Sequence, residues 1–169
     1  MNSNLAIAVR YLDGYLSGVA ALDGAIRQYT AEAFVIPGKN SSDSPEALIR
    51  DFYAAQTDFQ FSSSQQLQRG LGDLESQLGG YLMRRPLGLD EQTIPQQLIT
   101  DRRAFLAFRI MDIISDMAPE ARNLHSVYKL ETSASGSRSQ VTFFCVRVAT
   151  GFLVLQFNDD SLRIRAHGT

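Results

Sequence analysis

The chain begins with a long segment whose apolar residues recur at the period of a helix. From residue 5 to residue 29, leucine, valine and isoleucine return at steps of three and four positions, which predicts one amphipathic helix. The opposite side of this helix carries small residues, among them Gly14 and Gly18. Because each glycine in a helix costs about 1 kcal/mol relative to alanine, we expect close packing to offset that cost. The expected partner of this small-residue side is a helix of the same chain, with self-association as the alternative.

Residues typical of a helix N-terminus predict where a second helix begins. Residues 37–44 are rich in proline, glycine and serine and predict a loop. Ser44 then fits the N-cap of a helix, with Pro45 at its first position, and we expect this helix to run to about residue 59. The preceding residues 31–36 fit either an extension of the first helix or a short extended piece.

Two more helices are predicted before residue 118. Ser62 begins a capping-box pattern, and leucine recurs from Leu67 to Leu82 in a narrow seam of three- and four-residue steps. The seam spans barely two heptads, which favours packing on one partner helix over a free coiled coil. The last helix opens near Thr93 and ends near Met117. Its apolar residues occupy most of its sides, so we expect it to be the central, largely buried helix of the domain.

After residue 118 the period of the apolar pattern changes from 3.6 to 2. Short turns separate the apolar runs, among them a hairpin turn at Thr150 and Gly151, and they predict an antiparallel meander in chain order. Charged residues on the first and last run, such as Lys129 and Arg163, are typical of edge strands. The four strands are expected over residues 124–133, 140–149, 152–157 and 162–166.

The two middle runs are apolar on both of their faces. A strand with one face in water alternates apolar and polar residues, and residues 141–148 and 152–157 do not alternate in this way. Each face of the sheet therefore needs a cover. The cover is either the chain's own helices on both faces, or helices on one face and a partner on the other.

These patterns predict an α+β fold with about four N-terminal helices followed by a C-terminal four-stranded antiparallel meander. At 169 residues the chain is expected to form one domain, 1–169. Within it, residues 1–117 form the helical part and residues 124–167 the sheet part.

Charge and composition exclude several classes of function. The chain carries 16 basic and 18 acidic residues, a net charge of −2, which argues against nucleic-acid and anionic-membrane binding. No apolar stretch approaches the ~20 residues that span a bilayer. Residues 1–10 lack the pattern of a signal peptide, so we expect a cytoplasmic protein.

Of the 16 basic residues only Lys39 and Lys129 are lysine, and this arginine bias is typical of a GC-rich bacterial genome.

Catalytic signals are scarce. The sequence has no phosphate-binding glycine loop, no dinucleotide-binding motif and no zinc-protease or nucleophile-elbow motif. Its single cysteine, Cys145, lies mid-strand among apolar residues and is predicted to be a core residue rather than a nucleophile with His125 as its base. Arg109 and Asp112 are predicted to form an ion pair within the last helix, in preference to a metal-binding group of carboxylates. We therefore expect no cofactor, no metal and no catalytic residues.

The sequence favours a non-catalytic module that binds another protein, of the bacterial kind found among immunity proteins, antitoxins, secretion chaperones and adaptors. Residues 1–117 carry 10 basic and 14 acidic residues, and their net charge of −4 suits a basic target. A homodimer is the other partner considered. The candidate contact residues are Arg84, Arg85, Arg102 and Arg103.

The alternative function is a small-molecule-binding domain. Aromatic side chains between the helices and the sheet would line its pocket, with a few polar groups fixing the ligand. The candidate pocket residues are Phe105, Phe108, Tyr128 and Phe144.

Overall fold

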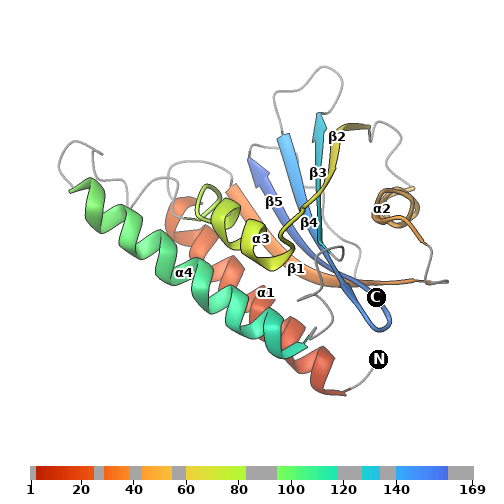
Figure 1. Cartoon of the computed structure of the whole chain (residues 1–169), viewed down its shortest axis with the longest axis horizontal. Coiled ribbons are helices and arrows are strands. Elements are labelled where there is room, and N and C mark those ends of the chain that lie inside the picture. Colours follow the sequence, from red (N-terminus) through yellow and green to blue (C-terminus); the bar gives the residue numbers. More distant parts are fainter. Residues whose placement is uncertain are drawn as a thin grey trace.

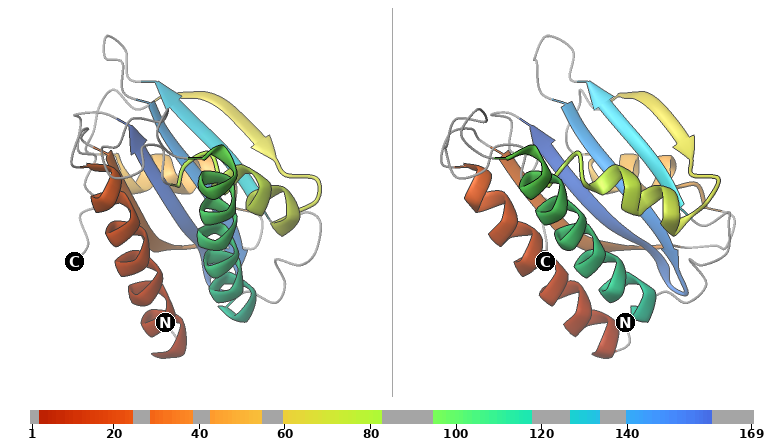
Figure 2. Two further views of the ribbon diagram at one scale, coloured as in Figure 1. Left: turned by 90° about the vertical axis from the view of Figure 1, so that its left-hand side faces the viewer. Right: turned by 60° about the vertical axis from the view of Figure 1, so that its left-hand side comes forward.

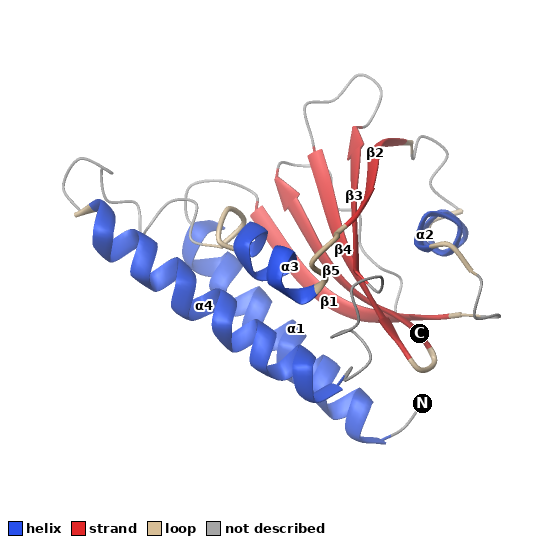
Figure 3. Cartoon of the chain, in the orientation of Figure 1, coloured by secondary structure: helices blue, strands red, loops and turns tan. Residues whose placement is uncertain are grey.

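The computed structural model describes residues 3–24, 29–38, 43–54, 60–82, 95–117, 127–133 and 140–159. Within these residues the chain forms four helices and one five-stranded antiparallel sheet (Figures 1 and 3). The predicted α+β class is confirmed. The elements in chain order are α1 (Ser3–Gly24), β1 (Tyr29–Pro37), α2 (Pro45–Phe52), β2 (Phe61–Gln66), α3 (Leu71–Leu78), α4 (Gln96–Met117), β3 (Val127–Ser133), β4 (Gln140–Val148) and β5 (Gly151–Asp159).

The sheet combines strands from both halves of the sequence, in the order β1-β5-β4-β3-β2. The C-terminal meander β3-β4-β5 is present as predicted and forms the centre of the sheet. Two strands of the N-terminal half pair with its outer sides. Strand β1 confirms the extended alternative for residues 31–36, whereas β2 shows that the helix predicted to begin at Ser62 is wrong, and the sheet has five strands where four were expected. The strand that carries Lys129 is consequently an inner strand and not an edge, because β2 pairs with it. The fourth predicted strand, 162–166, lies outside the described residues.

Strand β2 replaces the predicted start of a helix. The serines and glutamines that fitted a capping box lie in an extended segment, where Ser64 pairs with Leu130 and Gln66 with Tyr128. The side chains of Ser62 and Ser63 both bond to Glu131 on the neighbouring strand. Serine favours local side-chain hydrogen bonds over helix interior positions, and the long-range pairing with β3 decides the outcome here.

Both faces of the sheet are covered, as the doubly apolar strands predicted. Helices α1, α3 and α4 lie on one face, and α2 lies on the other (Figure 2). Phe144, Val146 and Leu155 belong to the core under the three helices, while Phe143 and Val154 belong to the core under α2. All five side chains are fully buried. No second molecule is needed to shield either face of β4 or β5.

Helix α1 covers the free edge of the sheet as well as its face. The carboxylate of Asp13 accepts a hydrogen bond from the backbone N–H of Ala33 on β1 (2.9 Å). One turn further along, the hydroxyl of Ser17 donates to the carbonyl of Ala31 (3.4 Å). Unpaired backbone groups of an edge strand attract foreign strands. The polar side chains of α1 therefore close an edge that would otherwise be open.

Helix α2 begins as the sequence predicted. The side chain of Ser44 accepts a hydrogen bond from the backbone N–H of Ala47, and Pro45 occupies the first turn. The helix ends at Phe52, earlier than expected. At its end the hydroxyl of Tyr53 donates to the side-chain oxygen of Gln156 on β5 (2.5 Å), a buried contact that ties α2 to the sheet.

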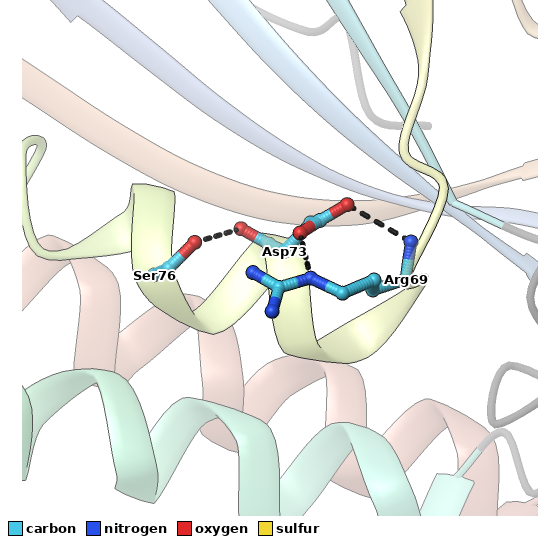
Figure 4. Close-up of polar contacts among 3 residues, drawn as sticks. All are labelled: Arg69, Asp73 and Ser76. Carbon is cyan, nitrogen blue, oxygen red and sulfur yellow. Dashed lines mark hydrogen bonds and ion pairs between the residues drawn. The ribbon is translucent and has the colours of Figure 1, made fainter.

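The leucine seam packs against the core rather than forming a long helix. Helix α3 starts after Gly70, and Asp73 in its first turn accepts from both the backbone N–H and the Nε of Arg69 (2.9 and 2.8 Å; Figure 4). These contacts lower the pKa of Asp73, with the backbone N–H as the first cause. Leu74 and Leu78 are fully buried, and α3 packs on α4, as predicted for a single partner helix.

A tight hairpin connects β4 to β5. Its two-residue loop is Ala149 and Thr150, because Val148 pairs directly with Gly151; the predicted hairpin is confirmed, one position earlier. Gly151 has φ +146°, and a Cβ at this position would lie 2.1 Å from the carbonyl oxygen of Ile36. Only glycine fits this close approach between β5 and β1.

Candidate functional site

Helices α1 and α4 lie side by side and antiparallel on the sheet (Figures 1 and 2). Their inner sides are buried in the same core, where Leu12 and Leu16 of α1 join Ile110 and Ile114 of α4. Burial raises the pKa of Tyr15 on α1, and the nearby charge of Arg109 on α4 partly offsets this effect. Tyr15 of α1 and Arg109 of α4 are therefore near enough for their charges to influence each other.

The surface of this helix pair that points away from the sheet is unusually apolar. Ile7 and Tyr11 on α1 are 67% and 56% exposed, and Phe105 and Phe108 on α4 are 63% and 55% exposed; Leu98 is also exposed. We call these five side chains the outer face. Their exposure corrects the expectation that the last helix is buried on most sides, because α4 buries its sheet-facing side and leaves two phenylalanines in water.

A groove runs between the two helices at one end of the outer face. Leu5, Ile7, Ala8 and Tyr11 of α1 line it together with Ile113, Asp116 and Met117 of α4, and its volume is about 620 Å³. Most of the lining is apolar, and Asp116 is the single charged residue in it. The groove is thus suited to receive bulky apolar side chains rather than a polar ligand.

Small residues continue the outer face along α1. A Cβ added at Gly14 or Gly18 would meet nothing within 4 Å. The predicted packing of this small-residue side on another helix of the chain is wrong, since the partner helix α4 contacts α1 on a different side. Within the described residues, the side of α1 that carries the two glycines is open.

Charged groups border the phenylalanines on α4. Arg109 and Asp112 form the predicted ion pair (3.1 Å), and the side chain of Gln97 donates to Asp101 (2.8 Å). Among the described residues, no group of three or more histidine, cysteine or carboxylate side chains could hold a metal ion. The carboxylates of α4 are therefore spread along the helix rather than gathered at one point.

The structure describes two of the four arginines predicted to contact a partner, and these two lie on different sides of α4. Arg102 is exposed on α4, near the outer face. Arg103 is half-buried and points toward α3, where it lines a shallow groove with Gly79 and Thr100. Arg84 and Arg85 lie outside the described residues.

The aromatic residues of the alternative pocket lie at three separate places. Phe105 and Phe108 are on the outer face. Phe144 is buried under α3 against Tyr81 (ring centroids 5.4 Å apart). Tyr128 lies on the opposite side of the sheet against Phe152. The structure does not bring the four side chains together.

The single thiol of the chain is a core group. Cys145 is fully buried under α2, and burial raises its pKa well above the usual value. A nucleophilic cysteine needs the reverse, a lowered pKa and access to solvent. His125, the base considered for it, lies outside the described residues.

One polar group was not anticipated. The ammonium of Lys129 pairs with Glu131 (2.9 Å) and lies 5.7 Å from the ring centre of Tyr81, while Ser63 donates to the same carboxylate. The Lys129 contact holds the pKa of Glu131 below its usual value. Lys129 had been predicted to mark an edge strand. In the structure Glu131 joins β3 to Ser63 of β2, and Lys129 lies against Tyr81, which follows the C-terminal end of α3.

The sequence of α1 contains a second, weaker periodic pattern that corresponds to the outer face. The stronger periodicity of leucine, valine and isoleucine drew attention to the core side instead. Ile7, Tyr11, Gly14 and Gly18 recur at steps of four, three and four residues, which places them on one side of a helix. This uncharged stripe lies on the side of the helix opposite the stronger leucine stripe. A helix with two such stripes is expected to have two partners, and the sheet supplies only one.

The described helices include none that is both long enough and apolar enough to cross a membrane. A comparison of the chain with models of known families and with curated proteins gives no match.

Proposed function

We propose that this chain is a non-catalytic module that binds protein through the outer face of α1 and α4. The bacterial classes suggested by the sequence are immunity proteins, antitoxins, secretion chaperones and adaptors. Proteins of these classes act by binding another protein. The observation that carries the proposal is the exposure of Ile7, Tyr11, Phe105 and Phe108 on one surface. Large contiguous apolar surfaces on a folded domain are typical of interaction sites.

The chemistry of the face supports a protein as the ligand. Aromatic residues are enriched at the centres of protein interfaces, where they fill pockets on the partner. The same helix pair offers two exposed phenylalanines on α4 and, nearer the C-terminal end of α4, an apolar groove of about 620 Å³. The four residues of the small-molecule alternative do not converge, so no observation favours that function.

The test compares proteins captured by the wild-type chain and by a variant of the outer face. The variant Phe105→Ser with Phe108→Ser removes two exposed rings without touching the core, so its unfolding free energy should stay close to that of the wild type. Tagged chains are expressed in the cells from which the sequence comes, and captured proteins are quantified by mass spectrometry. Glu75→Gln, an exposed change on α3, serves as the matched control.

The expected result is at least one protein, the untagged chain included, that the wild type and Glu75→Gln both enrich and the double variant loses. Equal sets of proteins for all three chains would overturn the proposal. Circular dichroism of each purified chain confirms that a loss of binding does not reflect loss of the fold.

A further inference from the structure

We propose that α2 is a strap that opens on its own while the rest of the fold stays intact, and that its opening uncovers the second face of the sheet. Helix α2 lies on the opposite side of the sheet from α1 and α4 (Figure 2), so this inference is independent of the proposed function. Three observations support it: the shortness of the helix, the few side chains that attach it, and the polar groups in the layer beneath it.

Helix α2 is too short to be stable without the sheet. It has 8 residues, whereas α1 and α4 on the other face have 22 each. Isolated helices shorter than about 12–15 residues are marginal in water, so α2 depends on its tertiary contacts. Among the described residues it is the one helix on its face (Figure 2). An element that depends on one set of contacts can separate from a domain as a unit.

Few buried side chains attach α2 to the sheet. Its buried residues are Pro45, Leu48 and Ile49, and Tyr53, directly after the helix, is buried as well. The hydroxyl of Tyr53 donates to the side-chain oxygen of Gln156. Within the described residues, opening of α2 therefore breaks this buried hydrogen bond and exposes four side chains of the segment. The other face, by contrast, retains the larger core under its three helices.

Two further contacts of α2 lie at its solvent-exposed rim. The hydroxyl of Ser64 on β2 donates to the carboxylate of Glu46, and the guanidinium of Arg50 lies 5.9 Å from the ring centre of Phe61. Exposed contacts of these kinds contribute little to stability, because water competes for the same groups. They guide α2 to its place on the sheet but hold it only weakly.

The layer under α2 contains polar groups that water can solvate. Thr132, Gln156 and Asn158 are buried. Their cross-strand partners Val141 and Phe143 belong to the core under α2, so these three polar side chains lie on that face. They are three of the four buried polar side chains in the described part of the chain. Because burial of polar groups is less favourable than burial of apolar groups, this face costs less to uncover than the other.

The thiol of Cys145 reports on the opening. It is the single cysteine of the chain, and its side chain is fully buried in the core under α2. Burial, and then the charge of Glu46 on α2, raise the pKa of this thiol, which places it near the helix. A reagent in solution reaches Cys145 either when α2 opens or when the whole chain unfolds. The two routes respond differently to substitutions.

The experiment measures how fast an aromatic disulfide reagent labels Cys145 in the folded full-length chain. The cysteine thiolate attacks the reagent and releases one coloured aromatic thiolate, and at low reagent concentration the rate is proportional to the population of the open state. Ser44→Ala and Tyr53→Phe weaken the closed position of α2, and each should speed labelling about fivefold or more. Asp13→Ala weakens the contact of α1 with β1 by a similar amount and should leave the labelling rate unchanged.

The urea dependence of labelling gives a second readout. Opening of α2 exposes a small part of the surface that global unfolding exposes, so the slope of its free energy against urea should be less than about half the global slope. Equal acceleration by Asp13→Ala would overturn the inference, because Cys145 would then be reached through global unfolding. Labelling that neither Ser44→Ala nor Tyr53→Phe accelerates would overturn it as well. Circular dichroism under the labelling conditions confirms that each variant is folded.

Discussion

Asp13 of α1 holds the backbone N–H of Ala33 at the outer edge of β1, with 2.9 Å between the carboxylate oxygen and the nitrogen. The bond joins a helix to a strand edge that faces away from β5. It gives an edge donor a partner within the chain, so that the donor is not available to a foreign strand.

Removal of this carboxylate should weaken the fold and expose the edge. Asp13→Ala is expected to lower the free energy of unfolding by about 1–2 kcal/mol, because a hydrogen bond to a charged acceptor is lost. Asp13→Asn keeps an acceptor oxygen and should lose less than half as much. Urea titration measures both, and equal losses for the two variants would show that the acceptor at Ala33 is unimportant.

The contact between Tyr53 and Gln156 makes a second prediction about stability. Tyr53→Phe deletes one hydroxyl from a buried site, and we expect a loss of about 1–2 kcal/mol because Gln156 loses a hydrogen-bond donor. Thermal and urea unfolding report the change. An unaltered stability would mean that the hydroxyl is not what joins α2 to β5.

The same tyrosine predicts how stability depends on alkaline pH. Burial, and then the charge of Glu32, raise the pKa of Tyr53 above its ordinary value of 10.0. The folded state therefore retains the phenol proton at pH values where the unfolded state loses it. The stability that Tyr53 adds relative to phenylalanine is fully present below pH 10 and should fall above it by at most about 1.4 kcal/mol per pH unit.

The measurement is the difference in unfolding free energy between the wild type and Tyr53→Phe from pH 8 to pH 11. Other groups that titrate in this range cancel in the difference. A difference that stays constant, or that grows with pH, would contradict the burial of this hydroxyl.

The hairpin glycine should tolerate no side chain. Gly151→Ala places a Cβ 2.1 Å from the carbonyl oxygen of Ile36, at a φ of +146° that alanine rarely adopts. We expect a loss of about 3 kcal/mol or more from backbone strain and steric overlap. Gly72→Ala in α3, where the nearest atom would be 4.0 Å away, is the control and should stabilise the chain by up to about 1 kcal/mol.

The cap of α2 carries a fifth prediction. Ser44→Ala removes the acceptor for the N–H of Ala47 and should cost about 1 kcal/mol, while Ser44→Asp keeps an acceptor and should be close to neutral. Chemical unfolding distinguishes the two. Because α2 is the one helix seen on its side of the sheet in the described chain, hydrogen exchange should also quicken at Cys145 and Phe143 in Ser44→Ala.

Sequence patterns predicted the parts of the fold in which burial repeats at a fixed period. The helix of residues 3–24, the helix that begins at Pro45 and the doubly apolar strands β4 and β5 all place their apolar side chains as the period required. Even the division of Phe143 and Phe144 between the two faces follows from alternation alone. In each case the local pattern and the tertiary burial agree.

The two flanking strands had no such pattern. Every residue of β2 after Phe61 is exposed, so no alternation of apolar and polar residues marks it as a strand. On β1 the residues beneath α1 are Ala31 and Ala33, which carry little apolar surface. Both strands form because a partner distant in sequence supplies the hydrogen bonds, and strand formation depends on such neighbours more than on local preference.

The outer face was missed for a different reason. The apolar residues of α4 occupy most of its sides, Phe105 and Phe108 among them, and such a pattern predicts burial on most sides. The apolar pattern of a single sequence does not show which side of such a helix faces the sheet, and the structure exposes both rings.

The placement of the late strands at the centre of the sheet has a consequence for synthesis on the ribosome. Pro37 of β1 pairs with Gly151 of β5, and at about 5–20 residues per second the ribosome needs on the order of ten seconds to make the chain between them. During that time the apolar stripe of α1 has no sheet on which to settle. The nascent chain therefore carries an amphipathic helix without its sheet until β5 has been made, and the core beneath α1 forms only late in synthesis.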